Sequence, residues 1–149
     1  MSLKERLRTD LTASIKGRDE VRSATLRMVL AAITNAEVAG KVAKQLTDDE
    51  IVSVLSTEVK KRREAATAFA DGGRQESSDR ELAEAAVIIE YLPAQLSADE
   101  ITDIVARAIS ESGATDATGM GRVMGLVTPQ VKGRADGAAV AAEVRRQLA

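Results

Sequence analysis

Apolar residues recur along this chain at intervals of three and four, the spacing of one face of an α-helix. The first stripe begins after Ser2, ends at Gly17 and consists of Leu3, Leu7, Leu11 and Ile15. A second helix is predicted between Asp19, a favourable N-cap, and Gly40. Its apolar positions form two faces, one of Leu26, Val29, Leu30 and Ile33, the other of Ala24, Met28, Ala32 and Ala36. A helix that is apolar around so much of its circumference is expected in the middle of a bundle.

Three further helices are predicted by capping boxes, in which a hydroxyl and a glutamate three residues later each bind a free backbone N–H. The boxes lie at residues 47–50, 78–81 and 97–100. The stripe behind the first ends at Gly72 and consists of Ile51, Val54, Leu55, Val59, Ala66 and Phe69. The stripe behind the second consists of Leu82, Ala86, Ile89 and Leu92. The stripe behind the third ends at Gly113 and consists of Ile101, Ile104, Val105, Ala108 and Ile109.

The last third of the chain predicts two more helices. Thr118 is expected to cap the first, whose apolar residues are Met120, Val123, Met124 and Val127. Pro129 should kink or end it. Residues 132–135 are expected to form a turn, and Asp136 to cap a final helix with Val140, Val144 and Leu148 facing inward. The small residues Gly121 and Gly125 are expected to let two helices approach closely.

Composition and one proline define the fold class. Alanine, the best helix former, occupies 26 positions, and the strand-favouring aromatic residues are nearly absent. Pro93 disfavours helix at Leu92, so a joint is expected there. The chain is predicted to be all-α, with an N-terminal helical domain of about four helices at residues 1–92 and a smaller three-helix unit at residues 93–149. The apolar Leu92 and Leu96 predict a packed joint rather than a loose linker.

The residue types that the chain lacks exclude several kinds of chemistry. It has no cysteine and no histidine, which excludes disulfides, thiol nucleophiles, Ser-His-Asp triads and ordinary zinc sites. One Phe and one Tyr are too few for an aromatic platform that stacks single-stranded RNA. The charged start lacks the apolar run of a signal peptide, and the apolar stretches 29–33 and 85–89 are too short to span a membrane. A cytoplasmic protein is expected.

Most motifs favour structure over chemistry. Residues 119–125 are glycine-rich, but the third glycine comes one position late for a dinucleotide fingerprint and no strand precedes it. Residues 60–63 are four consecutive cations, which point in different directions around a helix and are interpreted as a solvated face. One of Arg22 and Arg27 is expected to be partly buried in an ion pair. Glu84 and Glu90 flank an apolar stretch without a nucleophile nearby, so no catalytic, cofactor-binding or metal-binding residue is assigned.

Net charge is unevenly distributed along the chain. The total is −2, from 21 basic and 23 acidic residues, so no overall field favours binding to nucleic acid. Residues 93–116 carry one cation and five carboxylates, whereas residues 117–149 carry five cations and two carboxylates. Two interpretations stay open: these charges belong to ordinary solvated helix faces, or the basic segment binds a polyanion.

Several segments resemble the YqeY family. The most specific are residues 120–124 with Pro129, followed by residues 132–137 with Val140. Residues 2–7 resemble the N-terminus of the family. Further similar positions are Leu26, Arg27, Val54, Leu55, Lys61, Arg63, Glu64 and residues 91–97. Thr128 departs from the pattern, because the family often has an apolar residue before the proline.

The resemblance implies an all-α fold with a C-terminal three-helix module of the GatB/YqeY type. That module is similar to the tail domain of the GatB subunit of the glutamine-dependent tRNA amidotransferase, where it contacts the body of the tRNA. The chemistry of that enzyme lies elsewhere in the complex. A label as a carbon–nitrogen ligase with glutamine as amido donor would therefore be inherited, and this chain is not expected to be an enzyme.

The basic segment and the resemblance together indicate candidate RNA-binding residues: Arg122, Lys132, Gly133, Arg134, Arg145 and Arg146. Lysine, arginine and helix N-termini hold phosphates, and a bare glycine permits close approach to the backbone. Asp136 argues against a phosphate there, because a capping carboxylate competes for the same N–H groups. The competing interpretation is a structural turn in which Arg134 pairs with a neighbouring acid.

Two classes of function stay open. The first is a tRNA-binding or accessory module. The second is a protein-interaction module that docks onto an amidotransferase, an aminoacyl-tRNA synthetase or another translation-related enzyme. Participation in a carbon–nitrogen ligase comes third, and no cofactor, membrane or DNA partner is expected.

The purified chain is expected to hydrolyse neither glutamine nor ATP, because it lacks cysteine, a phosphate-binding loop and a Ser-Lys cluster of the amidase type. The measurement is ammonia release from glutamine by rigorously purified protein. Turnover that disappears on changing one residue of this chain would contradict the expectation.

Overall fold

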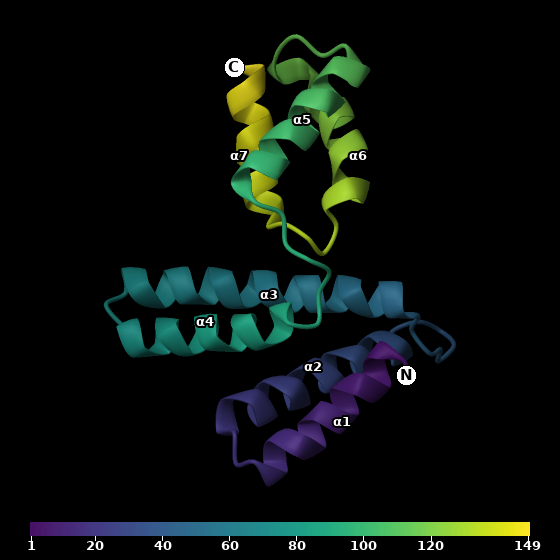
Figure 1. The fold of residues 1–149 in the computed structure, drawn as a ribbon, viewed down its shortest axis with the longest axis vertical. Coiled ribbons are helices and arrows are strands. Elements are labelled where there is room, and N and C mark those ends of the chain that lie inside the picture. Colours follow the sequence, from purple (N-terminus) through teal and green to yellow (C-terminus); the bar gives the residue numbers. More distant parts are fainter. The chain divides into compact units, whose positions relative to one another are not determined.

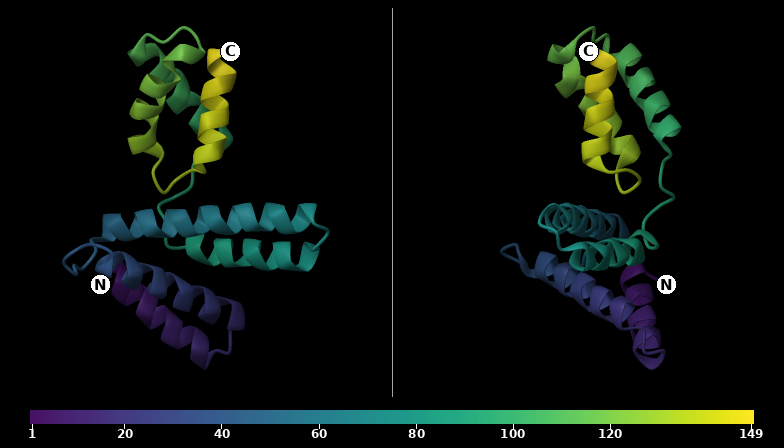
Figure 2. Two further views of the ribbon diagram at one scale, coloured as in Figure 1. Left: turned by 180° about the vertical axis from the view of Figure 1, so that it is seen from behind. Right: turned by 90° about the vertical axis from the view of Figure 1, so that its left-hand side faces the viewer.

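The computed structural model describes all residues from Met1 to Ala149 and contains helices without strands (Figure 1 and Figure 2). The elements are α1 (Leu3–Lys16), α2 (Glu20–Val38), α3 (Asp48–Asp71), α4 (Gln75–Ile89), α5 (Ala98–Ser112), the 3₁₀-helix η1 (Ala117–Gly119), α6 (Met120–Val131) and α7 (Gly137–Leu148). The all-α prediction is confirmed. No helix is both long enough and apolar enough to cross a membrane.

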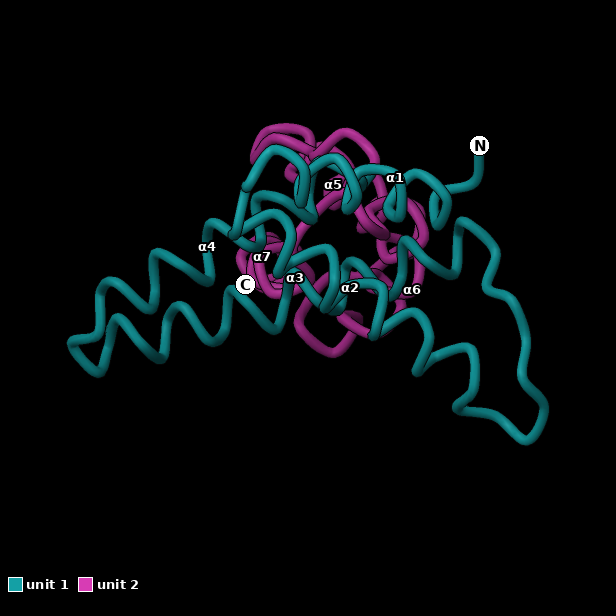
Figure 3. Tube along the Cα trace, turned by 90° about the horizontal axis from the view of Figure 1, so that it is seen from below, with its two compact units in different colours: residues 1–92 teal, residues 93–149 magenta.

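The chain divides into two compact units, residues 1–92 and residues 93–149 (Figure 3). Leu92 packs against the core of the first unit, and Leu96 packs against the core of the second. The apolar residues on either side of Pro93 thus each belong to one core, and residues 93–95 between them are exposed.

The first unit consists of two helical hairpins, α1–α2 and α3–α4, and α2 contacts each of the other three helices. Its core contains Leu7, Leu26, Val29, Ile33, Ile51, Leu55, Val59, Ala85, Val87, Ile88 and Tyr91. Helix α3 likewise contacts the other three helices, so the central place predicted for α2 is confirmed only in part. The second apolar face of α2 is only partly covered, because Met28 remains 43% exposed and Ala24, Ala32 and Ala36 are half-buried. Ile15, assigned to the inward stripe of α1, is likewise 47% exposed.

Two of the three predicted capping boxes are present, at Thr47 with Glu50 and at Ser97 with Glu100. Ser2 and Glu5 form a further capping box, which the sequence analysis did not predict. The box predicted at residues 78–81 is wrong, because α4 begins one turn earlier, at Gln75, and Ser78 is a buried residue within it. The inward face of α4 shifts accordingly to Ser78, Ala85 and Ile88, leaving Leu82 48% exposed.

The second unit packs α5, α6 and α7 around a core of small and branched residues. Its core contains Ile104, Val105, Ala108, Ala114, Val123, Val127, Val131, Val140, Val144 and Leu148. Asp136 caps α7 as predicted. Thr118 does not cap a helix; Asp116 does, accepting a hydrogen bond from the Thr118 N–H. Helix α6 continues two residues beyond Pro129, which lies in its last turn, where the missing N–H costs a single hydrogen bond.

The glycines of the second unit have roles other than those predicted. Gly121 and Gly125 are exposed, and a Cβ on either would have nothing within 4 Å, so they do not mediate close helix packing. Gly119 does, because a Cβ there would lie 2.5 Å from the Cβ of Ala114. The close approach that a glycine permits in this unit is therefore between η1 and the loop that follows α5.

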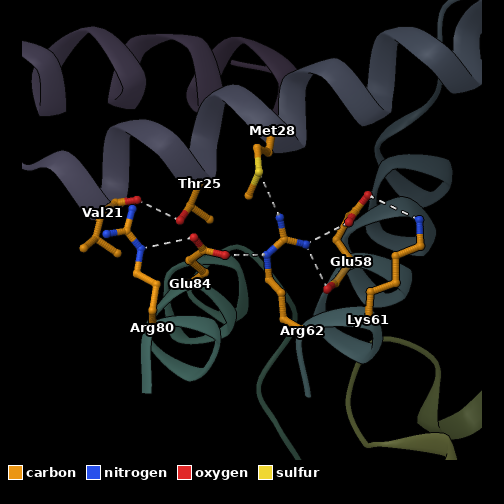
Figure 4. A network of polar contacts seen from close by, with 8 residues as sticks. All are labelled: Val21, Thr25, Met28, Glu58, Lys61, Arg62, Arg80 and Glu84. Atoms are coloured by element: carbon orange, nitrogen blue, oxygen red, sulfur yellow. Dashed lines mark hydrogen bonds and ion pairs between the residues drawn. The ribbon is translucent and has the colours of Figure 1, made fainter. Parts of the chain in front are cut away.

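A buried arginine joins three helices of the first unit (Figure 4). Arg62 on α3 is 7% exposed and donates to the carboxylate of Glu58 at 2.8 Å and to its carbonyl at 3.1 Å. Its Nη2 approaches Met28 Sδ on α2 at 3.8 Å, and its Nε lies 3.4 Å from Glu84 on α4 without a hydrogen bond. Arg80 holds the other oxygen of Glu84 at 3.2 Å. One guanidinium therefore compensates two carboxylates in an otherwise apolar region.

Replacing Arg62 by methionine should destabilise the first unit by about 3 kcal/mol, because Glu84 and Glu58 would lose a buried counterion. Adding Glu84→Leu to Arg62→Met should restore part of the loss, since it removes a buried carboxylate that would keep only the partly exposed Arg80 as a partner. The matched control, Lys60→Met, should change stability by less than about 1 kcal/mol, because Lys60 is exposed. The measurement is urea unfolding followed by the fluorescence of Tyr91, the only tyrosine in a chain without tryptophan. Equal losses for Arg62→Met and Lys60→Met would contradict the assignment.

Candidate nucleic-acid interface

The turn between α6 and α7 contains three of the six candidate residues. Gly133 has a φ of 72°, which a residue with a Cβ rarely adopts. Its carbonyl accepts a hydrogen bond from Gln95 Nε2 at 2.8 Å. The Leu96 N–H donates to the Arg134 carbonyl, also at 2.8 Å. The turn is therefore fastened to residues 95–96, which precede α5 within the same unit.

Arg134 takes part in the same attachment. Its Nε donates to the carbonyl of Ala94 at 3.1 Å, and no carboxylate lies within ion-pair distance. The expected ion pair with an acid is therefore replaced by a hydrogen bond to the backbone. The pKa of Glu100 is lowered mainly by hydrogen bonds from Ser97, and the positive charge of Arg134 lowers it further. Arg134 has a structural role that would compete with binding a phosphate.

The N-terminus of α7 is already occupied by its own cap. The side chain of Asp136 accepts a hydrogen bond from the Ala138 N–H at 3.1 Å. A phosphate at this position would meet a carboxylate rather than free N–H groups. Lys132, by contrast, is exposed and has no carboxylate within 4 Å, so it is available to a polyanion.

The other three candidates lie at the opposite end of the unit, near the start of α6 and the end of α7. Arg122 donates to the Ser112 carbonyl at 3.3 Å. Arg146 binds the carboxylate of Glu143 through Nε at 2.9 Å and through Nη2. Arg145 is exposed and has no carboxylate within 4 Å. Only Arg145 at this end is therefore without a polar partner.

Glu143 collects several hydrogen bonds on α7, one of them from α5. Besides Arg146, it accepts hydrogen bonds from Gln147 at 2.9 Å and from Thr102 of α5 at 3.2 Å. These bonds stabilise the charged form and lower the pKa of Glu143 to about 2, with the Arg146 bond as the largest cause. The same pair raises the pKa of Arg146. Arg146 is thereby engaged within the unit.

The structure does not bring the six candidates into one patch. The turn at residues 132–134 and the pair Arg145–Arg146 lie at opposite ends of α7, whose 12 residues span roughly 18 Å. The uneven charge of the sequence nevertheless remains visible on the surface. Helix α5 exposes Asp99, Asp103 and Glu111, whereas residues 117–135, which include α6, contain three cations and no carboxylate.

The cationic run at residues 60–63 does not form a binding patch. Its Arg62 is buried in the network described above, which corrects the interpretation of the whole run as a solvated face. Lys60 and Lys61 have Glu64 and Glu58 within 4.0 and 3.9 Å. The ion pair expected for Arg22 or Arg27 is found at Arg22, which contacts Glu90 and Asp19, whereas Arg27 is exposed.

The polar groups of the first unit are likewise engaged with one another. Tyr91 donates to Asp10 at 2.6 Å, and burial together with this bond raises the pKa of Tyr91 to about 12. The buried hydroxyls of Ser14 and Ser23 share a hydrogen bond of 2.9 Å. Glu84 and Glu90, the carboxylates considered for acid–base chemistry, both bind arginines. No group of three acidic side chains is placed to hold a metal ion.

Comparison with protein families gives a match over nearly the whole chain. Residues 4–148 match the family described as Yqey-like protein. The comparison with curated proteins found no match.

Glu143 should contribute to stability above pH 4.5, and this contribution should disappear as the pH falls from 4.5 towards about 2. The sign follows from a pKa that is lower in the folded chain than in the unfolded chain. Thermal unfolding of the parent and of Glu143→Gln between pH 7 and pH 2 should therefore converge at the acidic end. An NMR titration in which Arg146→Gln leaves the pKa of Glu143 unchanged would show that the Arg146 bond is not its cause.

Proposed function

The chain belongs to the YqeY family, and we propose that it is a non-catalytic accessory module that binds tRNA through the outer face of α6. This face consists of the exposed residues of α6, which are Gly121, Arg122, Gly125, Leu126, Thr128, Pro129 and Gln130. Lys132 follows it directly, and the nearest carboxylates in the sequence are Asp116 and Asp136.

The absence of any carboxylate on this face is the observation that carries the proposal. Exposed helices of soluble proteins usually mix both signs of charge, as α5 does here. A surface with cations and no acids lets a phosphate backbone approach without repulsion. The two exposed glycines support the same function, because nothing lies within 4 Å of a Cβ built on either and a sugar–phosphate chain can reach the helix backbone.

Binding of this kind would recognise shape rather than sequence. The unit has no aromatic side chain on which a base could stack. Folded RNA is often recognised through its phosphates and 2′-hydroxyls, which need only cations and polar groups. Arg134 and Arg146 are engaged within the unit, and Arg122 donates to one backbone carbonyl at 3.3 Å. About three cations at most are therefore available, and modest affinity with a clear dependence on salt is expected.

Docking onto a translation-related enzyme is the alternative function. A complex with such an enzyme that survives nuclease treatment would favour it over tRNA binding. Any part in a glutamine-dependent carbon–nitrogen ligation would come through that partner, since this chain has no cysteine, no phosphate-binding loop and no Ser-Lys cluster of the amidase type.

The proposal is tested by titrating bulk tRNA with the full chain at several salt concentrations. Changing Arg122 and Lys132 together to glutamine should reduce the slope of log K against log salt by up to about two, at roughly 0.7 to 0.9 per phosphate. The matched control changes Lys60 and Lys61 to glutamine in the first unit and should leave the slope unchanged.

A second pair of variants tests the absence of acids directly. Gly125→Glu places a carboxylate on the outer face of α6, where nothing within 4 Å obstructs it, and should weaken binding. Ala106→Glu places one on the exposed face of α5 and should have a smaller effect. A parent chain that binds no tRNA at low salt, or a loss confined to the control variants, would refute the proposal.

A further inference from the structure

The exposed face of α2 carries far less charge than its exposure predicts. Its exposed residues between Glu20 and Val38 are Arg27, Met28, Ala31, Thr34 and Asn35, with a single charge among them. Ala24, Ala32 and Ala36 border them and are half-buried. A solvent-exposed helix face is normally rich in charged residues. This surface, named here the open face of α2, is the second apolar face of the helix, which the bundle leaves partly uncovered.

Two hollows flank the open face. One, of about 460 Å³, lies where α1 turns into α2 and is lined by Ile15, Arg18, Asp19, Glu20, Ser23, Ala24 and Arg27. The other, of about 270 Å³, lies between α2 and α3 and is lined by Ala32, Asn35, Ala36, Val54, Thr57, Glu58 and Lys61. The first contains Ile15, which is 47% exposed. The open face thus has depressions into which side chains of a partner can fit.

The charges around the open face are not balanced. Each nearby carboxylate already has an arginine within ion-pair distance: Asp19 has Arg22 at 3.7 Å, Glu20 has Arg80 at 3.8 Å and Glu58 has Arg62 at 2.8 Å. Arg18 and Arg27 have no carboxylate within 4 Å. The unmatched charge beside this apolar surface is therefore positive.

Arg18 also adopts an unfavourable backbone conformation. Its φ of 57° makes it the only residue other than glycine with a positive φ. Such a φ is uncommon for residues with a Cβ. An arginine is nevertheless present here, next to Gly17, whose φ of −80° does not need a glycine. The guanidinium is therefore present at this turn despite a conformational cost.

We propose that the open face of α2 binds an acidic amphipathic helix of a partner protein. The alanines of α2 allow the axis of a second helix to approach closely, and apolar side chains of that helix would cover Met28 and Ile15. Carboxylates beside its apolar stripe would pair with Arg18 and Arg27. This inference concerns the first unit alone and does not depend on tRNA binding by the second.

The test uses three labelled peptides of about 18 residues, a length that permits a helix, and follows their fluorescence anisotropy with the full chain. The first has a leucine–alanine stripe and glutamates on its other positions. The second has the same composition in scrambled order. The third has lysine in place of glutamate. The first peptide should bind about tenfold more tightly than the other two, because only it combines the stripe with the matching charge.

Two substitutions on the open face are compared with two matched substitutions elsewhere. Arg27→Glu and Ile15→Ser should each weaken binding of the acidic peptide about fivefold or more. Arg107→Glu, on another exposed arginine without a carboxylate within 4 Å, and Leu82→Ser, at a side chain 48% exposed, should change it less than about twofold. None of the four removes a buried side chain, so the folded state should be retained, which circular dichroism checks.

Three results would overturn the proposal. Equal binding of the acidic peptide and its scrambled form would show attraction by charge alone. Equal losses in all four variants would place the binding surface elsewhere. Self-association in sedimentation equilibrium that Ile15→Ser abolishes would assign the open face to a second copy of this chain.

Discussion

The buried guanidinium of Arg62 sets the constraint on which the first unit depends. It lies where α2 passes the α3–α4 hairpin, and it contacts a side chain on each of the three helices. A buried charge is tolerated only with partners of good geometry, so the relative positions of Glu58, Glu84 and Met28 are restricted together. An apolar residue could fill the same volume without this restriction, because apolar contacts have no preferred direction. We therefore expect Arg62 to restrict how the three helices pack.

This constraint matters because the remainder of the core is built from small and branched side chains. Both cores are dominated by alanine, valine, leucine and isoleucine, and Tyr91 is the only aromatic residue among their buried members. Small side chains permit several helix registers of similar energy. Polar contacts with defined geometry reduce that choice: Ser14 with Ser23 between α1 and α2, and Glu143 with Thr102 between α5 and α7. In both units a few hydrogen bonds thus restrict the helix register, which apolar packing alone does not determine.

Much of this fold could be predicted from the sequence, and the failures have identifiable physical causes. Caps and glycines determine helix ends locally, which explains why the boundaries at Asp19, Thr47 and Ser97 were predicted correctly. The box at residues 78–81 failed because α4 begins one turn earlier, at Gln75, and Ser78 is buried within the helix rather than free to cap it. The buried face of α4 therefore differs from the predicted one, which was counted from the wrong helix start. Arg62 was missed because a run of four cations carries no signal of which one is buried; that depends on Glu84, 22 positions further along.

At the candidate site, the net charge of a sequence segment does not predict how its charged side chains are distributed over the surface. The sequence predicted the basic character of residues 117–149, but helix α7 places two groups of cations at its opposite ends, and internal partners engage Arg134 and Arg146. Two surfaces carry cations without a carboxylate within ion-pair distance. One is helix α6 in the second unit, and the other is the open face of α2 in the first unit. The two surfaces differ in the property on which each proposal rests: exposed glycines with open space around them at α6, and exposed apolar side chains beside arginines at α2. Each proposed surface belongs wholly to one compact unit, so the two proposals can be tested independently of each other.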